Sequence, residues 1–199
     1  MAKKCLQKLH IYVCNGAIGF NAFTGSKEPY YHLEFAPTVI DKLWRYFEFK
    51  GWINSPELSV ELVEDRNKFI VRDKLRSDPN PLPQVREVIA WDFAIMGLDL
   101  EVKYSGNAVD IMPLGINKGY ALADVKRRLQ LADGEIIKVG DKGQKGGNDY
   151  ELLAGPNSFT VDQGDEDNPN QVNVSNLLGI KCPDVTKYLI DILIEKLKA

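Results

Sequence analysis

Histidine and cysteine are scarce in this 199-residue sequence, and their scarcity argues against several kinds of site. Two histidines and three cysteines occur, and no two cysteines form a CxxC pair. Zinc sites of the Cys/His type depend on such clusters. His10 and His32 lie in no pattern typical of Ser-His-Asp or Cys-His catalysis, so we interpret both as structural residues.

Long apolar runs and basic stripes are missing as well. No run reaches the roughly 18 apolar residues of a membrane span, and the N-terminal MAKKCLQKLH lacks the apolar core of a secretory signal. The net charge is -3, and the only tight basic cluster, Lys126 to Arg128, is typical of a solvated helix face. The sequence therefore predicts no membrane or nucleic-acid partner and a cytoplasmic location.

Residues 36–114 repeat one layout of elements. Pro37 and apolar residues at helical spacing predict a first helix, and two strands flank the turn at Asp65-Arg66-Asn67. A second helix and a second hairpin around Ser105-Gly106-Asn107 follow. We expect a four-stranded antiparallel sheet with two helices on one face, an α+β domain of order αββαββ.

After residue 114 the predicted elements alternate between helix and strand, which is typical of a parallel α/β layer. We predict a boundary near 114–117. The expected elements are a helix at Lys118–Leu131, a buried strand at Glu135–Val139, a short helix at Asn148–Ala154, a strand at Ser158–Val161, an acidic loop at Asp162–Gln171 and an amphipathic helix from Val185 to Leu197.

A polar loop after the predicted strand Glu135–Val139 carries the best candidate chemistry. Sites in open α/β sheets form at the carboxyl ends of strands, where the Asp141 carboxylate could ligate Mg²⁺. Gly143, Gly146 and Gly147 would let backbone N–H groups approach an anion, and Asn148 would cap the next helix. The ordinary interpretation of such a loop is only a turn.

Lys118 is a second candidate, because a lysine at a helix start opposes the helix dipole. An ammonium group aimed at a phosphoryl oxygen would explain its position. No GxxxxGK[ST] phosphate loop occurs.

Two stretches, SGNAVDIMPLGINKGYAL (105–122) and IIKVGDKGQKGGNDYELL (136–153), resemble the haloacid dehalogenase-like phosphatase superfamily, as does CNGA at 14–17. The resemblance is to its sugar-phosphate phosphatases with a large α/β cap. It implies an α/β fold with a partial Rossmann-like parallel core at 1–35 and 115–199, and an inserted α+β cap at 36–114. The cap would select the substrate, with Arg66, Arg72, Lys74 and Trp91 among the residues that could face it, whereas Trp44 and Trp52 are expected in or near the core.

The resemblance also assigns roles. Lys118 would neutralise the nucleophile and phosphate, Asp141 would ligate Mg²⁺, and Asn148 and Asp149 would support metal and phosphate, with Gly147 beside them at the phosphate. The spacing from Asp141 to Asn148 is seven positions, longer than in many relatives, which implies a wider phosphate loop.

The family's aspartate nucleophile, in a DxDx[TS] motif, has no match in this sequence. Two interpretations follow. The chain is one portion of a Mg²⁺-dependent sugar-phosphate hydrolase whose aspartate lies elsewhere, or it is an inactive relative that binds phosphorylated sugars or a protein partner. Missing core strands would leave unpaired strand edges, so a homo-oligomer or a complementing chain is a further expectation.

Overall fold

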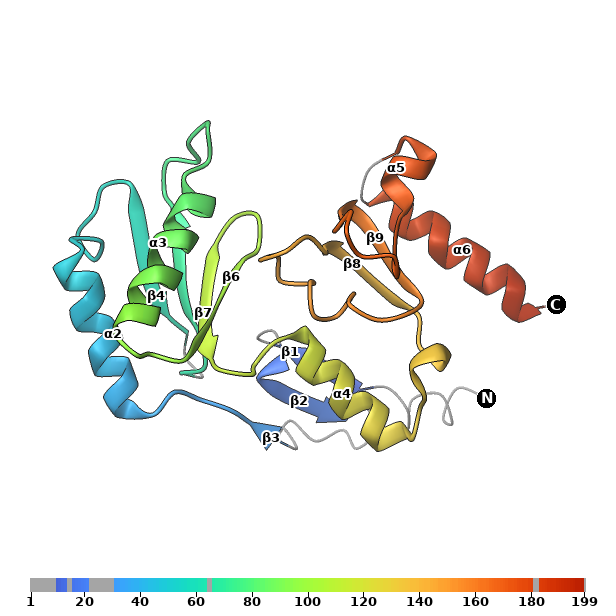
Figure 1. The fold of residues 1–199 in the computed structure, drawn as a ribbon, viewed down its shortest axis with the longest axis horizontal. Coiled ribbons are helices and arrows are strands. Elements are labelled where there is room, and N and C mark those ends of the chain that lie inside the picture. The colour runs from blue at the N-terminus through green and yellow to red at the C-terminus, as the bar shows by residue number, and fades with distance from the viewer. Residues whose placement is uncertain (1–9, 14–15, 22–30, 64–65, 181–182, 199) are drawn as a thin grey trace. The chain divides into compact units, whose positions relative to one another are not determined.

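The computed structural model describes residues 10–13, 16–21, 31–63, 66–180 and 183–198. The chain divides into two compact units, Met1–Ala121 and Leu122–Ala199, here called unit 1 and unit 2. Figure 1 shows the elements of each unit. Among the described residues no helix is both long and apolar enough to cross a membrane.

The order αββαββ predicted for residues 36–114, the expected cap, is confirmed element by element (Figure 1). Its sheet has the order β4-β5-β7-β6 with antiparallel pairing throughout. The elements are α2 (Pro37–Phe49), β4 (Leu58–Leu62), β5 (Phe69–Asp73), α3 (Leu82–Ile95), β6 (Leu100–Tyr104) and β7 (Val109–Pro113).

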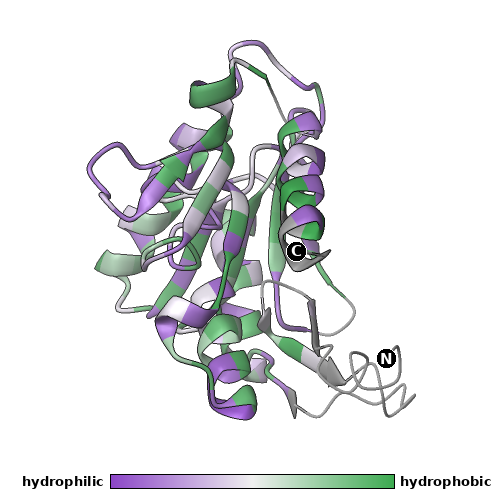
Figure 2. Cartoon of the chain, turned by 90° about the vertical axis from the view of Figure 1, so that its right-hand side faces the viewer, coloured by the Kyte–Doolittle hydropathy of each residue, from purple (hydrophilic) through white to green (hydrophobic). Residues whose placement is uncertain are grey.

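One hydrophobic core joins the two helices to one face of this sheet. Leu43 and Phe47 of α2 and Phe93 of α3 are buried against alternate strand residues such as Phe69 and Ile111. Alternation places the intervening side chains on the other face of the sheet, where Lys68 and the buried Asp110 form an ion pair at 3.3 Å. As predicted, Trp44 and Trp52 pack against the core. Figure 2 shows the hydropathy of these elements.

Unit 1 also contains a separate three-stranded antiparallel sheet, β1 (His10–Val13), β2 (Ile18–Asn21) and β3 (Tyr31–His32). Ala17 and Ile18 are buried together with Met112 and Ile116, so this sheet packs beside the end of the cap. The grouping of 1–35 with 115–199 as one core stays a prediction.

Unit 2 is built on a parallel sheet of order β10-β9-β8, which confirms the predicted parallel layer. Val161, Val174 and Val185 form its buried core. The elements are α4 (Lys118–Leu129, which begins in unit 1), β8 (Lys138–Lys142), β9 (Ser158–Gln163), β10 (Gln171–Asn173), α5 (Val174–Leu178) and α6 (Asp184–Lys198).

Two predictions in unit 2 are wrong. The strand expected at Glu135–Val139 begins at Lys138, because a 3₁₀ turn occupies Asp133–Glu135 and pairing with β9 starts at Lys138. Asp141 therefore lies within the strand. The helix expected at Asn148–Ala154 is a series of turns. The basic cluster of α4 is exposed but paired, since Arg127 and Arg128 both bind the buried Asp124.

Candidate functional site

The loop after β8 is closed by one buried carboxylate. Asp149 is 1% exposed, and its Oδ2 accepts the backbone N–H groups of Asp141 at 2.9 Å and of Lys142 at 3.1 Å. In return the N–H of Asp149 donates to the carbonyl oxygen of Lys142 at 3.1 Å. Asp149 thus fixes the backbone that carries Asp141, and the two residues predicted from the sequence are brought together.

The glycines of this loop allow its close packing. A Cβ on Gly147 would lie 2.2 Å from the carbonyl oxygen of Lys142, and one on Gly140 would lie 2.7 Å from Cγ of Asp149. The N–H of Gly147 donates to the carbonyl oxygen of Gln144 at 2.9 Å. The amide of Gly147 is therefore satisfied within the loop, and its expected role at a phosphate stays a prediction.

Asn148 supplies an oxygen that has no hydrogen-bond partner in the described part of the chain. Its Oδ1 is buried and accepts no hydrogen bond from the described part of the chain. A buried polar atom without a partner is costly, by about 1–3 kcal/mol, and an ion or a ligand group would satisfy it. This orphaned oxygen, in a loop with two carboxylates, fits the preference of Mg²⁺ for hard oxygen ligands.

The same loop does not form a complete cation cage by itself. Within the described residues, no cluster of three or more His, Cys, Asp or Glu side chains could hold a metal ion. Mg²⁺ commonly takes only one or two carboxylates and completes its shell with water and substrate phosphate oxygens. Asp141, Asn148 and Asp149 supply side-chain oxygens of the kind that Mg²⁺ prefers, so the residue types of this segment fit the ion.

Lys118 begins α4, in unit 1, and local contacts fix its position. Oδ1 of Asn117 accepts the N–H of Tyr120 at 2.9 Å, the bond of a helix-capping residue. Nδ2 of Asn117 lies 3.4 Å from Oε1 of Glu101 on β6. Gly16 packs underneath with φ +97°, and a Cβ there would lie 2.8 Å from the carbonyl oxygen of Asn117. Asn117, Glu101 and Gly16 thus hold the start of the helix.

The cap contains a polar pocket of about 760 Å³ in unit 1. Three basic side chains line it, those of Arg72, Lys74 and Arg76, against one carboxylate, that of Asp73. Arg72 binds Glu61 at 2.8 Å and Lys74 donates to the carbonyl oxygen of Ser55 at 2.7 Å. The Arg76 guanidinium forms no ion pair among the residues that the structure describes.

Asp73 reduces this positive charge without cancelling it, because it is one carboxylate among three basic side chains. Desolvation acts to raise the pKa of Asp73, but backbone N–H groups that donate to the carboxylate outweigh it, so the pKa lies below the ordinary value. The donors are Ser77 at 2.5 Å and Leu75 at 2.8 Å. Ser59, Ser77, Asn80 and Asn107 add hydroxyl and amide groups to the wall. The pocket combines net positive charge with the polar groups that sugars bind.

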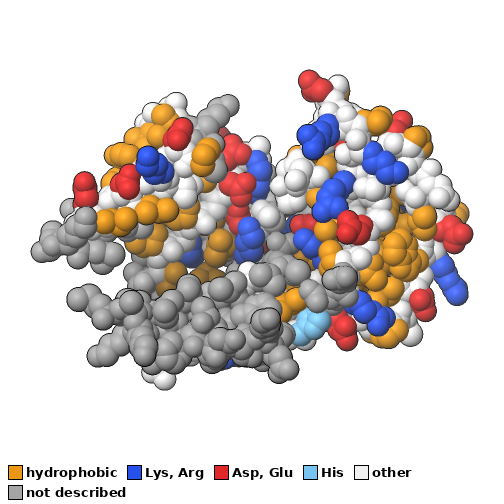
Figure 3. Space-filling model, turned by 180° about the vertical axis from the view of Figure 1, so that it is seen from behind, with side chains coloured by type: hydrophobic (Ala, Val, Ile, Leu, Met, Phe, Trp, Pro, Cys, Tyr) orange, Lys and Arg blue, Asp and Glu red, His pale blue; other side chains and the backbone are white. Residues whose placement is uncertain are grey.

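Sequence reasoning found part of this pocket and missed the rest. Arg72 and Lys74, which the sequence analysis named as residues that could face a substrate, line this pocket. Trp91, named with them, lies on α3, in the helix layer. Arg76 was missed, although the basic run Lys74-Leu75-Arg76 after a strand is a usable signal. Elsewhere, Figure 3 shows acidic and basic side chains interspersed on the face drawn.

Comparison with solved structures shows the fold. A protein of Streptococcus mutans UA159 shares 17% identity and a TM-score of 0.61, over 94% of this chain and 79% of that one. A HAD/COF-like hydrolase of Plasmodium vivax shares 15% sequence identity with a TM-score of 0.61. The match covers 80% of this chain and 64% of that one. The sucrose-phosphatase of Synechocystis sp. PCC6803, solved with sucrose and phosphate, shares 16% sequence identity with a TM-score of 0.49. That match covers 76% of this chain and 58% of the phosphatase. The chain thus spans less than two thirds of the last two proteins.

No curated protein sequence matches the chain. The family model for eukaryotic phosphomannomutase matches residues 42–177, more than half of the sequence. This match begins within α2 and includes the other cap elements, Lys118 and the whole segment Asp141–Asp149. Together with the solved structures it confirms the haloacid dehalogenase-like fold expected from the sequence. The chain belongs to the eukaryotic phosphomannomutase family, within the haloacid dehalogenase-like superfamily.

Proposed function

We propose that this chain binds a phosphorylated hexose together with Mg²⁺ and serves phosphoryl-transfer chemistry of the haloacid dehalogenase type. The observation that carries the proposal is the closed loop of β8, in which Asp149 fixes the backbone of Asp141 and Asn148 presents an unsatisfied oxygen. A Mg²⁺ held by this loop would neutralise negative charge on phosphoryl oxygens.

The substrate class follows from the cap pocket and the family. Its basic side chains and its serine and asparagine groups suit a phosphorylated sugar, with Arg76 as the anion-binding group. The family's name refers to phosphomannose, so mannose phosphates are the first compounds to test. Lys118 is proposed to face the phosphate as well, and Gly147 to border it.

The reaction needs a nucleophile that this sequence does not contain in a DxDx[TS] motif. Hydrolysis or mutase chemistry would require an aspartate from outside these 199 residues. Without one, the same residues make a module that binds phosphorylated sugars. That second function is favoured by the absent motif alone. A cytoplasmic location belongs to both proposals.

The test measures binding and turnover in the same preparation. Mannose 1-phosphate and mannose 6-phosphate are titrated with and without Mg²⁺, and the release of phosphate and the interconversion of the two isomers are followed. Asp141→Ala should abolish the Mg²⁺-dependent gain in affinity. Asp167→Ala, in an exposed loop of the same unit, is the matched control and should leave that gain unchanged. Arg76→Gln should weaken binding, with Lys187→Gln on α6 as its control.

Each outcome assigns one function. Turnover that needs both Mg²⁺ and Asp141 identifies an enzyme, and binding without turnover identifies a binding module. Absence of any Mg²⁺-dependent binding of either mannose phosphate would contradict the proposal.

A further inference from the structure

Unit 2 contains a cavity of about 440 Å³ beside the loop that joins β9 to β10. Its volume lies within the range of small-molecule sites. Six of the side chains that line it are amides of asparagine or glutamine and three are carboxylates, and the described lining includes no lysine or arginine. We call this cavity the amide pocket. Its charge has the opposite sign to that of the basic cap pocket.

The wall of the amide pocket is tied to the segment that carries Asp141. Nε2 of Gln171 donates to the carbonyl oxygen of Gly143 at 3.0 Å, and its Oε1 accepts the N–H of Asp165 at 3.0 Å. The N–H of Gly143 in turn donates to the carbonyl oxygen of Gln163 at 2.7 Å. A Cβ on Gly143 would lie 2.7 Å from Oε1 of Gln171, so this contact requires glycine. The wall is therefore ordered before any ligand binds, which lowers the entropy cost of binding.

Several side-chain donors of the wall are already used within unit 2. Nδ2 of Asn173 donates to the carbonyl oxygen of Asp162 at 3.2 Å, and the Thr160 hydroxyl donates to that of Gln163 at 2.9 Å. Nε2 of Gln144 donates to Oε1 of Gln163 at 2.6 Å. These bonds use donors of the wall and leave acceptors in excess.

Gln144 contributes one of these acceptors. Its Oε1 is buried and accepts no hydrogen bond from the described part of the chain. A buried oxygen without a partner is costly, and a ligand that donates a hydrogen bond would satisfy it. A water molecule would suffice for this oxygen alone, but the carboxylates of the same pocket favour a donor that is positively charged.

Two of the three carboxylates keep their negative charge without a cation beside them. Asp162 is paired with Lys142 at 2.5 Å. Asp165 and Glu166 form no ion pair with the residues that the structure describes. Asp165 accepts the backbone N–H of Asp167 at 3.2 Å, which leaves its charge in place. The amide pocket therefore retains two negative charges.

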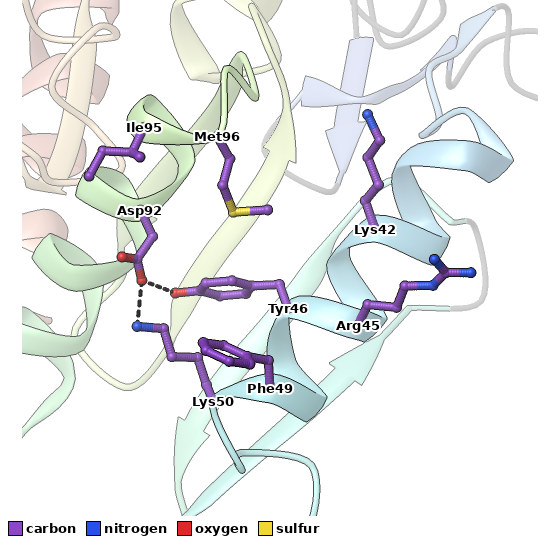
Figure 4. Close-up of a pocket in the computed structure, with 8 residues that line it drawn as sticks. All are labelled: Lys42, Arg45, Tyr46, Phe49, Lys50, Asp92, Ile95 and Met96. Carbon is purple, nitrogen blue, oxygen red and sulfur yellow. Dashed lines mark hydrogen bonds and ion pairs between the residues drawn. The ribbon is translucent and has the colours of Figure 1, made fainter.

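Carboxylates that line the pockets of unit 1 are engaged, by contrast. Asp92, in the groove between α2 and α3, accepts the Tyr46 hydroxyl at 2.8 Å and binds the Lys50 ammonium at 2.8 Å (Figure 4). Asp73 accepts backbone N–H groups in the cap pocket. The two carboxylates of the amide pocket that lack a cation are thus a local feature of this site.

We propose that the amide pocket binds a linear aliphatic diamine. A primary ammonium group has three hydrogen-bond donors and no acceptor, which suits Oε1 of Gln144 together with a carboxylate. Two ammonium groups match the two charges of Asp165 and Glu166. A ligand this small binds with a dissociation constant on the order of 0.1 mM. The proposal requires neither Mg²⁺ nor a sugar phosphate.

The experiment is calorimetric titration of the full chain with 1,4-diaminobutane at low ionic strength and without Mg²⁺, since salt screens such charges. We expect one binding site. Butylamine, with one ammonium group, and 1,4-butanediol, with none, should each bind at least about tenfold more weakly.

Variants locate the site. Asp165→Asn and Glu166→Gln keep the shape of the side chain, and each should weaken binding of the diamine by about tenfold. Asp191→Asn and Glu195→Gln remove the same charges from exposed positions on α6 and are the matched controls. Both controls should leave the affinity unchanged.

Hydrogen exchange with mass spectrometry tests the link to the Asp141 segment. At about ten times its dissociation constant the diamine should slow exchange in peptides 141–149 and 164–171 by up to about tenfold, because Gln171 joins the two. The peptides of β4 and β5 should not change.

Four results would overturn the proposal. They are no binding of the diamine at about 10 mM, equal affinity for butylamine, unchanged affinity in both carboxylate variants, and protection confined to unit 1. Displacement of the diamine by Mg²⁺ at a lower concentration would assign the pocket to a metal ion and would also overturn it.

Discussion

Replacement of Asp149 by alanine tests the central feature of the candidate site, the carboxylate that closes the β8 loop. The two N–H groups that it accepts, those of Asp141 and Lys142, would be left without this partner. Since both belong to the end of β8, the loop and its strand should loosen together.

The magnitude follows from burial and geometry. A hydrogen bond to a charged group contributes about 1.5–3 kcal/mol, so two contribute about 3–6 kcal/mol. Removal of the buried charge of Asp149 also removes the cost of its desolvation, which offsets part of the lost hydrogen-bond energy. The free energy of unfolding of unit 2 is therefore expected to fall by about 2–4 kcal/mol. Asp149→Asn keeps an acceptor oxygen of the same shape, and because neutral bonds are about half as strong, it should lose about 1–2 kcal/mol.

The assay must separate the two units. All three tryptophans, Trp44, Trp52 and Trp91, lie in unit 1, so tryptophan fluorescence reports on that unit. Hydrogen exchange followed by mass spectrometry reports on the peptides of β8 and β9. In Asp149→Ala these peptides should exchange about 30- to 1,000-fold faster, equivalent to about 2–4 kcal/mol. The urea midpoint from tryptophan fluorescence should not move.

Unchanged exchange at Asp141 and Lys142 in Asp149→Ala would refute the reasoning, because the carboxylate would then not hold that backbone. A loss of protection in Asp149→Asn as large as in the alanine variant would also count against it. Because the hydrogen bonds are made to a charged carboxylate, the loss of protection should be larger in Asp149→Ala than in Asp149→Asn.

Three further perturbations address unit 1 and can be followed by tryptophan fluorescence. Gly16→Ala places a Cβ against the carbonyl oxygen of Asn117 in a left-handed backbone, and should cost about 2–5 kcal/mol in urea unfolding; an unshifted midpoint would contradict that packing. Phe69→Ala removes a fully buried ring and should cost about 3–5 kcal/mol, which a shift below 1 kcal/mol would disprove. Hydrogen bonds from Lys50 and Tyr46 lower the pKa of Asp92 in the folded state, so Asp92 stabilises the fold above its unfolded pKa of about 4, and this stabilisation is lost as the pH falls further. Asp92→Asn should therefore flatten the decrease of the unfolding free energy at acid pH. An unaltered decrease in the variant would exclude Asp92 as its source.

The cap could be predicted from the sequence because each of its elements repeats a strong local pattern. Pro37 stands at the first turn of α2, as expected, and apolar residues recur at helical spacing on the inner side. The turn residues of both hairpins separate β-rich runs. Where local preference and tertiary packing agree in this way, the pattern alone defines the element.

The errors in unit 2 arose where packing outweighed local preference. Ile136 and Ile137 suggested a strand, but the side chain of Glu135 accepts the N–H of Ala132 and supports a 3₁₀ turn there. Asn148 looked like a helix cap, yet the next residue, Asp149, turns its carboxylate back to β8. Backbone contacts of this kind leave no periodic trace in the sequence.

Candidate site residues could be chosen from the sequence, but the geometry of the segment that carries them could not be predicted. Asp141 and Asn148 stood out by residue type and by position after a strand, whereas the buried orphan oxygen of Asn148 depends on how the loop closes. The basic cap pocket depends on residues of β4, β5 and the β6–β7 turn, which antiparallel pairing brings to the same end of the cap sheet.

The short span of the β8 loop has a consequence for the order of folding. Asp149 reaches Asp141 across 8 positions, whereas Tyr46 reaches Asp92 across 46. By the logarithmic dependence of chain closure on length, the shorter connection costs about 1.5 kcal/mol less entropy. The loop can therefore assemble on its own soon after β9 is synthesised, while the two cap helices must first find each other across a long stretch of chain.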